Sequence, residues 1–169
     1  MALVDELIAA SGAVTAGAPL TLGRWWPKGP IVVQPAFEPP TYNDAVEVRR
    51  TADRLLVGWI HQHEQAGVRI NYADALGRGW HPLLNEWREI PMLSLVGWVA
   101  RGLREGDASV FADVILSRGE RQLPTIVATP VDVARLTAIW HCDKPVIQGL
   151  KAAEAVVVVY RQGAVFEVR

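Results

Sequence analysis

The sequence has few of the features that indicate a secreted protein or a membrane protein. Its single cysteine, Cys142, cannot form an internal disulfide, so nothing indicates an oxidising compartment. The first residues place two acids, Asp5 and Glu6, where a secretory signal would carry basic side chains, and the apolar run there is too short to span a bilayer. We therefore expect a cytoplasmic protein with no membrane contact. The preference for arginine over lysine is typical of GC-rich bacterial genomes.

The sequence also lacks an excess of charge of either sign. It carries 17 basic and 18 acidic residues and a formal net charge of -1. Contact with nucleic acid or with an anionic membrane needs clustered, uncompensated positive charge. Arg49, Arg50 and Arg54 would form such a cluster only if unpaired, and Glu47 and Asp53 can pair with them. Weak nucleic-acid binding is therefore kept only as a second alternative.

Recurrent motifs of catalysis and cofactor binding are absent. There is no G-x-G-x-x-G after a strand and no glycine-rich loop with a Walker lysine. His61 and His63 resemble a pair of metal ligands, but residues two apart on a helix point about 200° apart and cannot share an ion. We expect neither a metal site nor a cofactor.

Helical patterns dominate the first part of the chain. Apolar residues recur at helical spacing near the N-terminus and again over 43–66, which predicts the longest helix. Six prolines over 18–40 exclude a helix there, and the apolar residues between them predict an extended arm whose tryptophans sit in grooves of the body. A short strand at 68–70 and a proline-interrupted helix over 83–104 complete this part.

Strand patterns dominate the second part of the chain. The apolar runs at 110–116 and 123–128 predict strands, and Thr129-Pro130 predicts the start of a helix. Two β-branched runs on either side of Gly163 predict a terminal hairpin. Helices followed by strands indicate an α+β fold, in which a small mixed or antiparallel sheet of about four to five strands packs against one helix.

The length of 169 residues fits a single domain. We divide it into an N-terminal helix with the proline-rich arm (1–42), a helical segment (43–106) and a sheet-forming segment (107–169). The last strand, 164–168, would be an open edge of the sheet. We therefore expect a homodimer in which this strand pairs with the same strand of a second copy.

Two groups of residues are candidates for a functional site. Asp113 interrupts an apolar run, and a buried carboxylate often has a function. The alternatives are a strand covered on one face only, with Asp113 partly exposed, and a helical segment. The loop after the first short strand mixes polar and aromatic residues, as binding loops do. The weak catalytic candidates are Tyr72, Asp74, His81 and Asp113.

Tryptophan and arginine are enriched at protein interfaces. The candidates for a protein-binding surface are Trp25, Trp26, Arg78, Trp80, Trp87 and Arg88.

These observations favour one function over two others. The leading hypothesis is a non-catalytic bacterial interaction or regulatory protein that binds another protein through its Trp/Arg surface. The first alternative is a small metal-independent enzyme with a pocket between the central helices and the C-terminal sheet. The second alternative is a weak nucleic-acid-binding protein.

Overall fold

The computed structural model of the chain describes residues 2–13, 17–22, 26–27, 29–35, 42–71, 84–96, 105–129, 148, 150–152, 156–161 and 165–168. The helices are α1 (Ala2–Ser11), α2 (Tyr42–His63), α4 (Leu84–Glu89) and α5 (Glu105–Glu120). The strands are β1 (Pro30–Pro35), β2 (Gly67–Asn71), β3 (Met92–Val96), β4 (Thr125–Ala128), β5 (Val156–Arg161) and β6 (Val165–Val168).

All of these strands belong to one sheet in the order β2-β3-β4-β1-β5-β6. Neighbouring strands from β2 to β5 pair in parallel, and β6 pairs antiparallel with β5. Parallel neighbours need crossover connections, and here the helices along the chain supply them. The architecture is therefore α/β, and the predicted α+β fold with a small mixed or antiparallel sheet is wrong.

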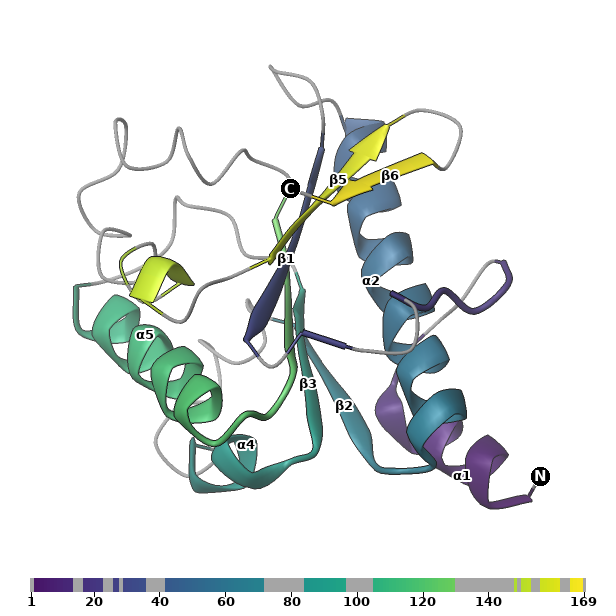
Figure 1. The fold of residues 1–169 in the computed structure, drawn as a ribbon, viewed down its shortest axis with the longest axis horizontal. Coiled ribbons are helices and arrows are strands. Elements are labelled where there is room, and N and C mark those ends of the chain that lie inside the picture. The colour runs from purple at the N-terminus through teal and green to yellow at the C-terminus, as the bar shows by residue number, and fades with distance from the viewer. Residues whose placement is uncertain are drawn as a thin grey trace.

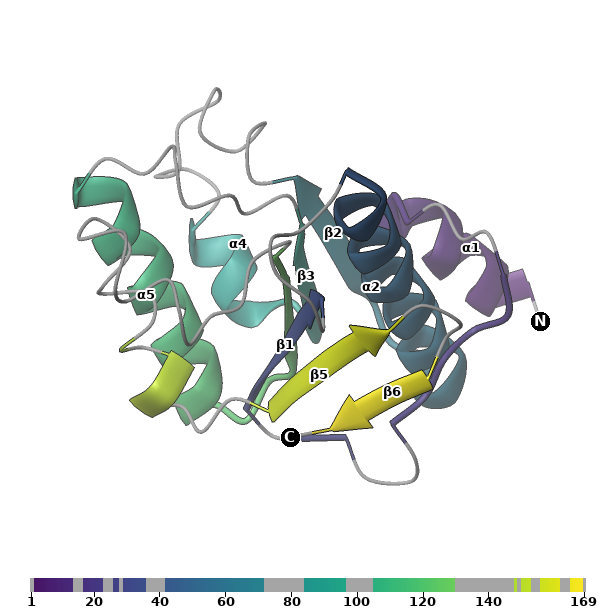
Figure 2. The ribbon, with the colours of Figure 1, turned by 90° about the horizontal axis from the view of Figure 1, so that it is seen from above.

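The helices cover the sheet from both sides. Helices α1 and α2 lie on one face, and α4 and α5 lie on the other, as Figures 1 and 2 show in two perpendicular views. Burial of one such aliphatic side chain stabilises the fold by about 1.5–3 kcal/mol. The largest part of the core lies between α2 and the sheet and includes Ile31, Val33, Leu56, Ile60, Met92 and Ile126.

Strand β1 lies inside the segment that the sequence predicts to be an extended arm. Its sequence is PIVVQP, and the two prolines occupy its first and last positions. A strand tolerates proline at its ends, because the residues between them still donate to both neighbours. Pairing with β4 and β5 makes this strand the centre of the parallel sheet, and all of its residues are buried.

The predicted secondary structure of two apolar runs is wrong: one is a helix instead of a strand, and the other is a strand instead of a helix. The run at 110–116, predicted as a strand, lies within α5, whereas Met92–Val96, predicted as part of a helix, is β3. In α5 the buried residues Ala112, Ile115 and Arg118 recur three apart, which is a helical spacing. Short apolar runs fit a buried strand and a buried helix equally well.

Other predicted elements are confirmed. The longest helix is α2, the short strand near Val68 is β2, and the run at 123–128 contains β4. The terminal hairpin also forms, with Val158 opposite Val168 and Arg161 opposite Val165. The homodimer through β6 stays a prediction. The helix expected after Thr129 lies outside the described residues.

The arm crosses the outer side of α2. The backbone N–H of Leu20 donates to the carbonyl of Arg54 (3.0 Å), and Nε of Arg54 donates to the carbonyl of Ala18 (2.7 Å). Further along, the half-buried Trp26 donates from Nε1 to Oε1 of Gln62 (2.7 Å) and packs against the core. The expected contact between arm and body therefore exists for these residues, while Trp25 lies outside the described part of the chain.

Gly58 lets the arm lie this close to the helix. A Cβ at this position would overlap the carbonyl oxygen of Leu20, so no larger residue fits beneath the arm. Replacing glycine by alanine inside a helix ordinarily stabilises it by about 1 kcal/mol. At Gly58 we expect the opposite sign, because the arm must move away and uncover the apolar surface beneath it.

We predict that Gly58→Ala lowers the free energy of unfolding by about 1–3 kcal/mol, as measured by urea unfolding followed by circular dichroism. The matched control is Gln62→Ala, which removes the exposed bond to Trp26 without any overlap with the arm. It should cost no more than about 0.5 kcal/mol. A Gly58→Ala protein as stable as the original would show that the arm does not depend on this contact.

Candidate functional site

The course of the chain through the sheet marks one place for a ligand. From β1 the chain enters α2 and crosses to β2 at the far edge of the sheet, and it then returns through β3 to β4, which lies beside β1. After β4 it passes to β5 on the other side of β1. The connections that leave β1 and β4 therefore run in opposite directions. Open parallel sheets bind ligands outside the carboxyl ends of strands at such a point.

Two buried polar side chains mark the carboxyl ends of these strands. Val33 lies opposite Ala128, and the N–H of Thr129 donates to the carbonyl of Val33 (3.0 Å). Gln34 and Thr129, each one residue further on, are therefore neighbours. Side chains alternate between the faces of a sheet. Because Val33 and Ala128 pack toward α2, Gln34 and Thr129 point toward the opposite face. Their exposed fractions are 4% and 1%.

The strand ends at this edge carry no formal charge. Hydroxyl and amide groups can both donate and accept hydrogen bonds. Such groups can orient a polar ligand but do not neutralise a charge on it. The last two residues are Gln34-Pro35 in β1, Ile70-Asn71 in β2 and Leu95-Val96 in β3, and β4 ends at Ala128, which Thr129 follows.

Asp113 is exposed on a helix, in agreement with the alternatives to a buried functional carboxylate. It lies on α5 with 66% of its side chain exposed, and it accepts a hydrogen bond from Nη2 of Arg88 at 2.5 Å. An exposed ion pair of this kind contributes little stability. The structure thus brings together one catalytic candidate and one binding candidate, but away from the crossing point. The other catalytic candidates, Tyr72, Asp74 and His81, lie outside the described residues.

The described tryptophans serve the packing of the fold. Trp26 anchors the arm and contacts His63 edge to face (6.4 Å between centroids), while Trp87 is buried in α4. His63 also stacks on Trp59 at 4.6 Å, and its Nδ1 lies 3.0 Å from the Trp59 carbonyl. The candidates Trp25, Arg78 and Trp80 lie outside the described residues. No group of three potential metal ligands occurs in the part of the chain that the structure describes.

Two of the three arginines of α2, Arg50 and Arg54, are engaged within the fold. Arg50 pairs with Glu47 (2.6 Å), as the sequence predicts, and Arg54 binds the arm. Asp53 is buried and pairs with Arg69 of β2 (2.8 Å) instead of with its helical neighbours. Arg49 is exposed, and of the three predicted basic residues it alone remains outside these contacts.

Across the described residues, no helix is both long and apolar enough to cross a bilayer.

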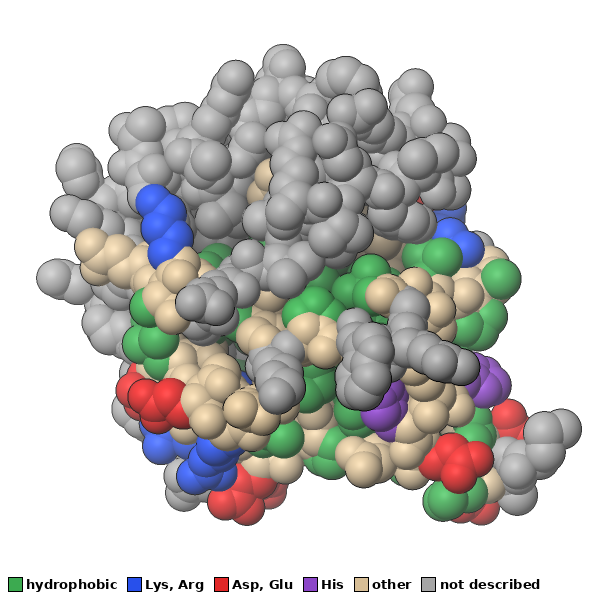
Figure 3. Space-filling view, in the orientation of Figure 1, with side chains coloured by type: hydrophobic (Ala, Val, Ile, Leu, Met, Phe, Trp, Pro, Cys, Tyr) green, Lys and Arg blue, Asp and Glu red, His purple; other side chains and the backbone are tan. Residues whose placement is uncertain are grey.

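A charged pocket of about 440 Å³ lies beside α4 and the end of α5. Its lining consists of Glu86, Arg88, Glu89 and Arg121. Figure 3 shows acidic and basic side chains side by side over these helices. The acids and bases of the lining also face one another, since Arg121 lies 3.4 Å from Glu89.

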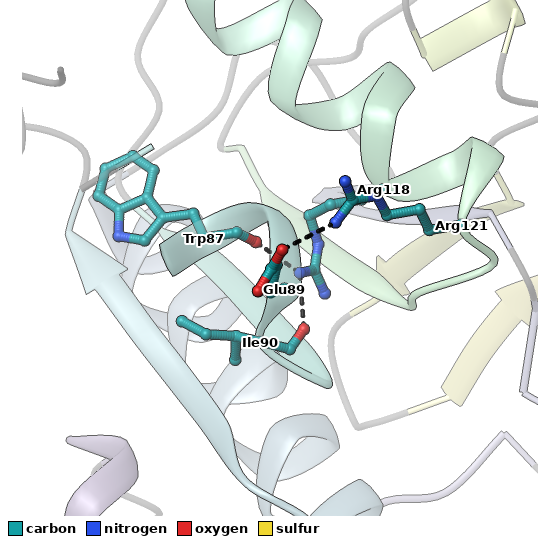
Figure 4. A network of polar contacts seen from close by, with 5 residues as sticks. All are labelled: Trp87, Glu89, Ile90, Arg118 and Arg121. Carbon is teal, nitrogen blue, oxygen red and sulfur yellow. Dashed lines mark hydrogen bonds and ion pairs between the residues drawn. The ribbon is translucent and has the colours of Figure 1, made fainter. Parts of the chain in front are cut away.

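Arg118 lies deeper in the same region and holds three elements together (Figure 4). It is fully buried on α5. Its Nη1 donates to the carbonyls of Trp87 (2.6 Å) and Ile90 (2.7 Å), its Nη2 to that of Pro124 (2.8 Å), and its Nε to Oγ1 of Thr125 (2.7 Å). Burial lowers the pKa of Arg118 to about 10, so the guanidinium keeps its charge at neutral pH. Sequence reasoning missed this residue, because nothing in the local pattern distinguishes it from a surface arginine.

Comparisons with known proteins identify the fold. Neither a family model nor a curated protein matches the sequence. The crystal structure of the DnaC helicase loader is similar with a TM-score of 0.57 and 14% identity over 79% of this chain and 79% of that chain. The structure of DnaI has a TM-score of 0.54 and 11% identity over 94% of this chain and 81% of that chain.

These similarities establish the fold. The parallel sheet in the order β1-β4-β3-β2, alternating with helices, is the arrangement of AAA+ ATPases. This finding overturns the leading hypothesis of a non-catalytic protein that acts through a Trp/Arg surface, and Trp26 and Trp87 are in fact used for packing. It agrees better with the first alternative, a small metal-independent enzyme with a pocket between the central helices and the C-terminal sheet.

The sequence departs from the motifs of phosphate-binding ATPases at two places. Such proteins follow their first strand with G-x-x-x-x-G-K-[ST] and hold Mg²⁺ with an acid of the Walker B motif. Between β1 and α2 this chain has Ala36-Phe37-Glu38-Pro39-Pro40-Thr41, without glycine or lysine. From Ile90 to Arg104, which includes β3, it has no carboxylate.

The network around Arg118 allows a test of its structural role. We predict that Arg118→Ala lowers the free energy of unfolding by at least about 3 kcal/mol, because it leaves several buried acceptors without a donor. Arg121→Ala is the matched control, since Arg121 is exposed and its ion pair is loose. It should cost less than about 0.5 kcal/mol. Urea unfolding measures both, and equal stability of the two variants would contradict the assignment.

Proposed function

We propose that this chain binds a nucleotide beyond the carboxyl ends of β1 and β4 and does not hydrolyse it rapidly. The observation that carries the proposal is the strand order, which creates the crossing point beside Gln34 and Thr129. Ligands of open parallel sheets bind at such points. Similarity to DnaC and DnaI supports a nucleotide as the ligand class, since the shared arrangement is that of AAA+ ATPases.

The sequence around the site lacks the groups that rapid hydrolysis of a nucleotide needs. Phosphoryl transfer depends on a loop that cradles the phosphates, a lysine that reaches them and a metal that neutralises the developing charge. The stretch between β1 and α2 supplies neither the glycines nor the lysine, and no carboxylate follows β3 as far as Arg104. Electrostatic stabilisation of the transition state usually contributes more to catalysis than any other effect. Because DnaC is a helicase loader, we propose an assembly step of that kind as the use of nucleotide binding.

Fluorescent nucleotides provide a direct test. Titration of the full chain with N-methylanthraniloyl-ADP, with energy transfer from its tryptophans, should give saturable binding with a dissociation constant of roughly 0.1–1 mM, about 4–5.5 kcal/mol. Unlabelled ADP should compete for the same site. Phosphate release from ATP and Mg²⁺ should stay at the level of the buffer.

Two results would overturn the proposal. Absence of saturable binding to about 5 mM nucleotide would show that the site does not take this ligand class. Hydrolysis of about one ATP per second that depends on Mg²⁺ would show that other residues replace the missing motifs. Arg121→Ala, which lies away from the crossing point, should bind nucleotide as the original chain does.

A further inference from the structure

We infer that the charged pocket beside α4 binds a short peptide with free ends, whose amino group pairs with Glu86 and whose carboxylate pairs with Arg88. This pocket lies apart from the proposed nucleotide site. Helix α4 leads into β3, and Arg121 shortly precedes β4, so the pocket lies at the amino ends of these strands. Gln34 and Thr129 lie at the carboxyl ends of their strands. The inference therefore does not depend on the proposed function.

The lining of the pocket contains one acid and one base that the fold leaves largely unused. Glu89 and Arg121 pair with each other (Figure 4), which leaves Glu86 and Arg88. Glu86 is exposed, and within the described part of the chain its carboxylate makes neither an ion pair nor a hydrogen bond. Arg88 pairs with Asp113, which does not belong to the lining. The pocket thus presents two opposite charges that do not neutralise each other.

Arg88 has fewer partners than its guanidinium can serve. It donates one hydrogen bond, from Nη2 to Oδ2 of Asp113 (2.5 Å), and its Nε is buried without a partner. Arg118, by comparison, donates to four acceptors from all three of its nitrogens. A buried N–H without an acceptor destabilises a fold by more than an exposed ion pair stabilises it. A ligand carboxylate that accepts from Nε and from one Nη would therefore replace the bond to Asp113 with a net gain.

The charges of the lining favour a ligand that carries both signs. A guanidinium binds a carboxylate through two parallel hydrogen bonds, and a carboxylate binds an ammonium group. A purely anionic ligand would be repelled by Glu86 and Glu89, and a purely cationic one by Arg88 and Arg121. Complementary charges at both positions also select against ligands that lack one of them. A zwitterion is the class that meets both conditions.

The separation of the two charges favours a peptide over a single amino acid. Residues two apart on a helix point about 200° apart, so Glu86 and Arg88 meet the pocket at separate places. The two charged groups of an amino acid share one carbon atom, whereas the ends of an extended tripeptide are up to about 10 Å apart. The pocket volume of about 440 Å³ lies within the range of small-molecule sites.

NMR titration of the ¹⁵N-labelled full chain with triglycine tests the inference. The Nε–H signal of Arg88, identified by its loss in Arg88→Lys, should shift and saturate with a dissociation constant of about 1 mM, because Nε gains an acceptor. Three other probes are expected to bind at least about tenfold more weakly. Glycine has its charges too close together, N-acetyl-triglycine has no amino group, and triglycinamide has no carboxylate.

Two variants should change the affinity in opposite directions. Asp113→Ala should strengthen triglycine binding about threefold, because Asp113 competes with the ligand for Arg88. Glu86→Gln should weaken it about tenfold, because the ammonium group loses its partner. Glu120→Gln is the matched control, since Glu120 is an exposed acid at the end of α5 and does not line the pocket. Circular dichroism of each variant separates loss of a contact from loss of the fold.

Three results would overturn the inference. Absence of a saturable shift up to about 20 mM triglycine would show that the pocket does not take this class of ligand. N-acetyl-triglycine that binds as tightly as triglycine would show a site for anions only. A folded Glu86→Gln protein with unchanged affinity would show that the amino group is not recognised. Because the nucleotide titration measures a separate site, none of these results bears on the proposed function.

Discussion

The burial of β1 on both faces and along both edges constrains the whole molecule. Its backbone pairs in parallel with β4 on one side and β5 on the other, although these strands lie about a hundred residues further along the chain. A parallel sheet of this kind is stable only when helices cover both faces, because neither face can meet water. The positions of α2 on one side and α5 on the other, and the crossing point between β1 and β4, follow from this requirement.

Buried polar groups set a second constraint, which the fold meets with specific partners. The Arg118 guanidinium is satisfied by carbonyls from α4, the turn before β3 and the turn before β4, together with one hydroxyl. On the other face, Asp53 of α2 pairs with Arg69 of β2. Removing one member of such a set costs far more than its presence contributes, since the remaining polar groups stay buried without partners. Both sets lie away from the crossing point, so we assign them to stability.

Several features of the structure follow from local patterns in the sequence. The apolar stripe of α2, the terminal hairpin and the contact of the proline-rich arm with the body all follow from side-chain spacing, β-branched residues and proline geometry over short stretches. The Glu47–Arg50 pair lies within one helix and was equally accessible. Gln34 and Thr129, in contrast, are ordinary residues until a fold makes them neighbours.

The strand order, and with it the fold class and the candidate site, depends on contacts between segments that are distant in the sequence. The runs that form α5 and β3 are short and apolar, so periodicity could not separate helix from strand, and packing on both sides of the sheet resolved the ambiguity. The segment PIVVQP reads as an arm because of its prolines, yet it becomes the central strand through partners near residues 126 and 157. Local propensity carries no information about hydrogen bonds between segments so distant in the chain, and these bonds define the sheet.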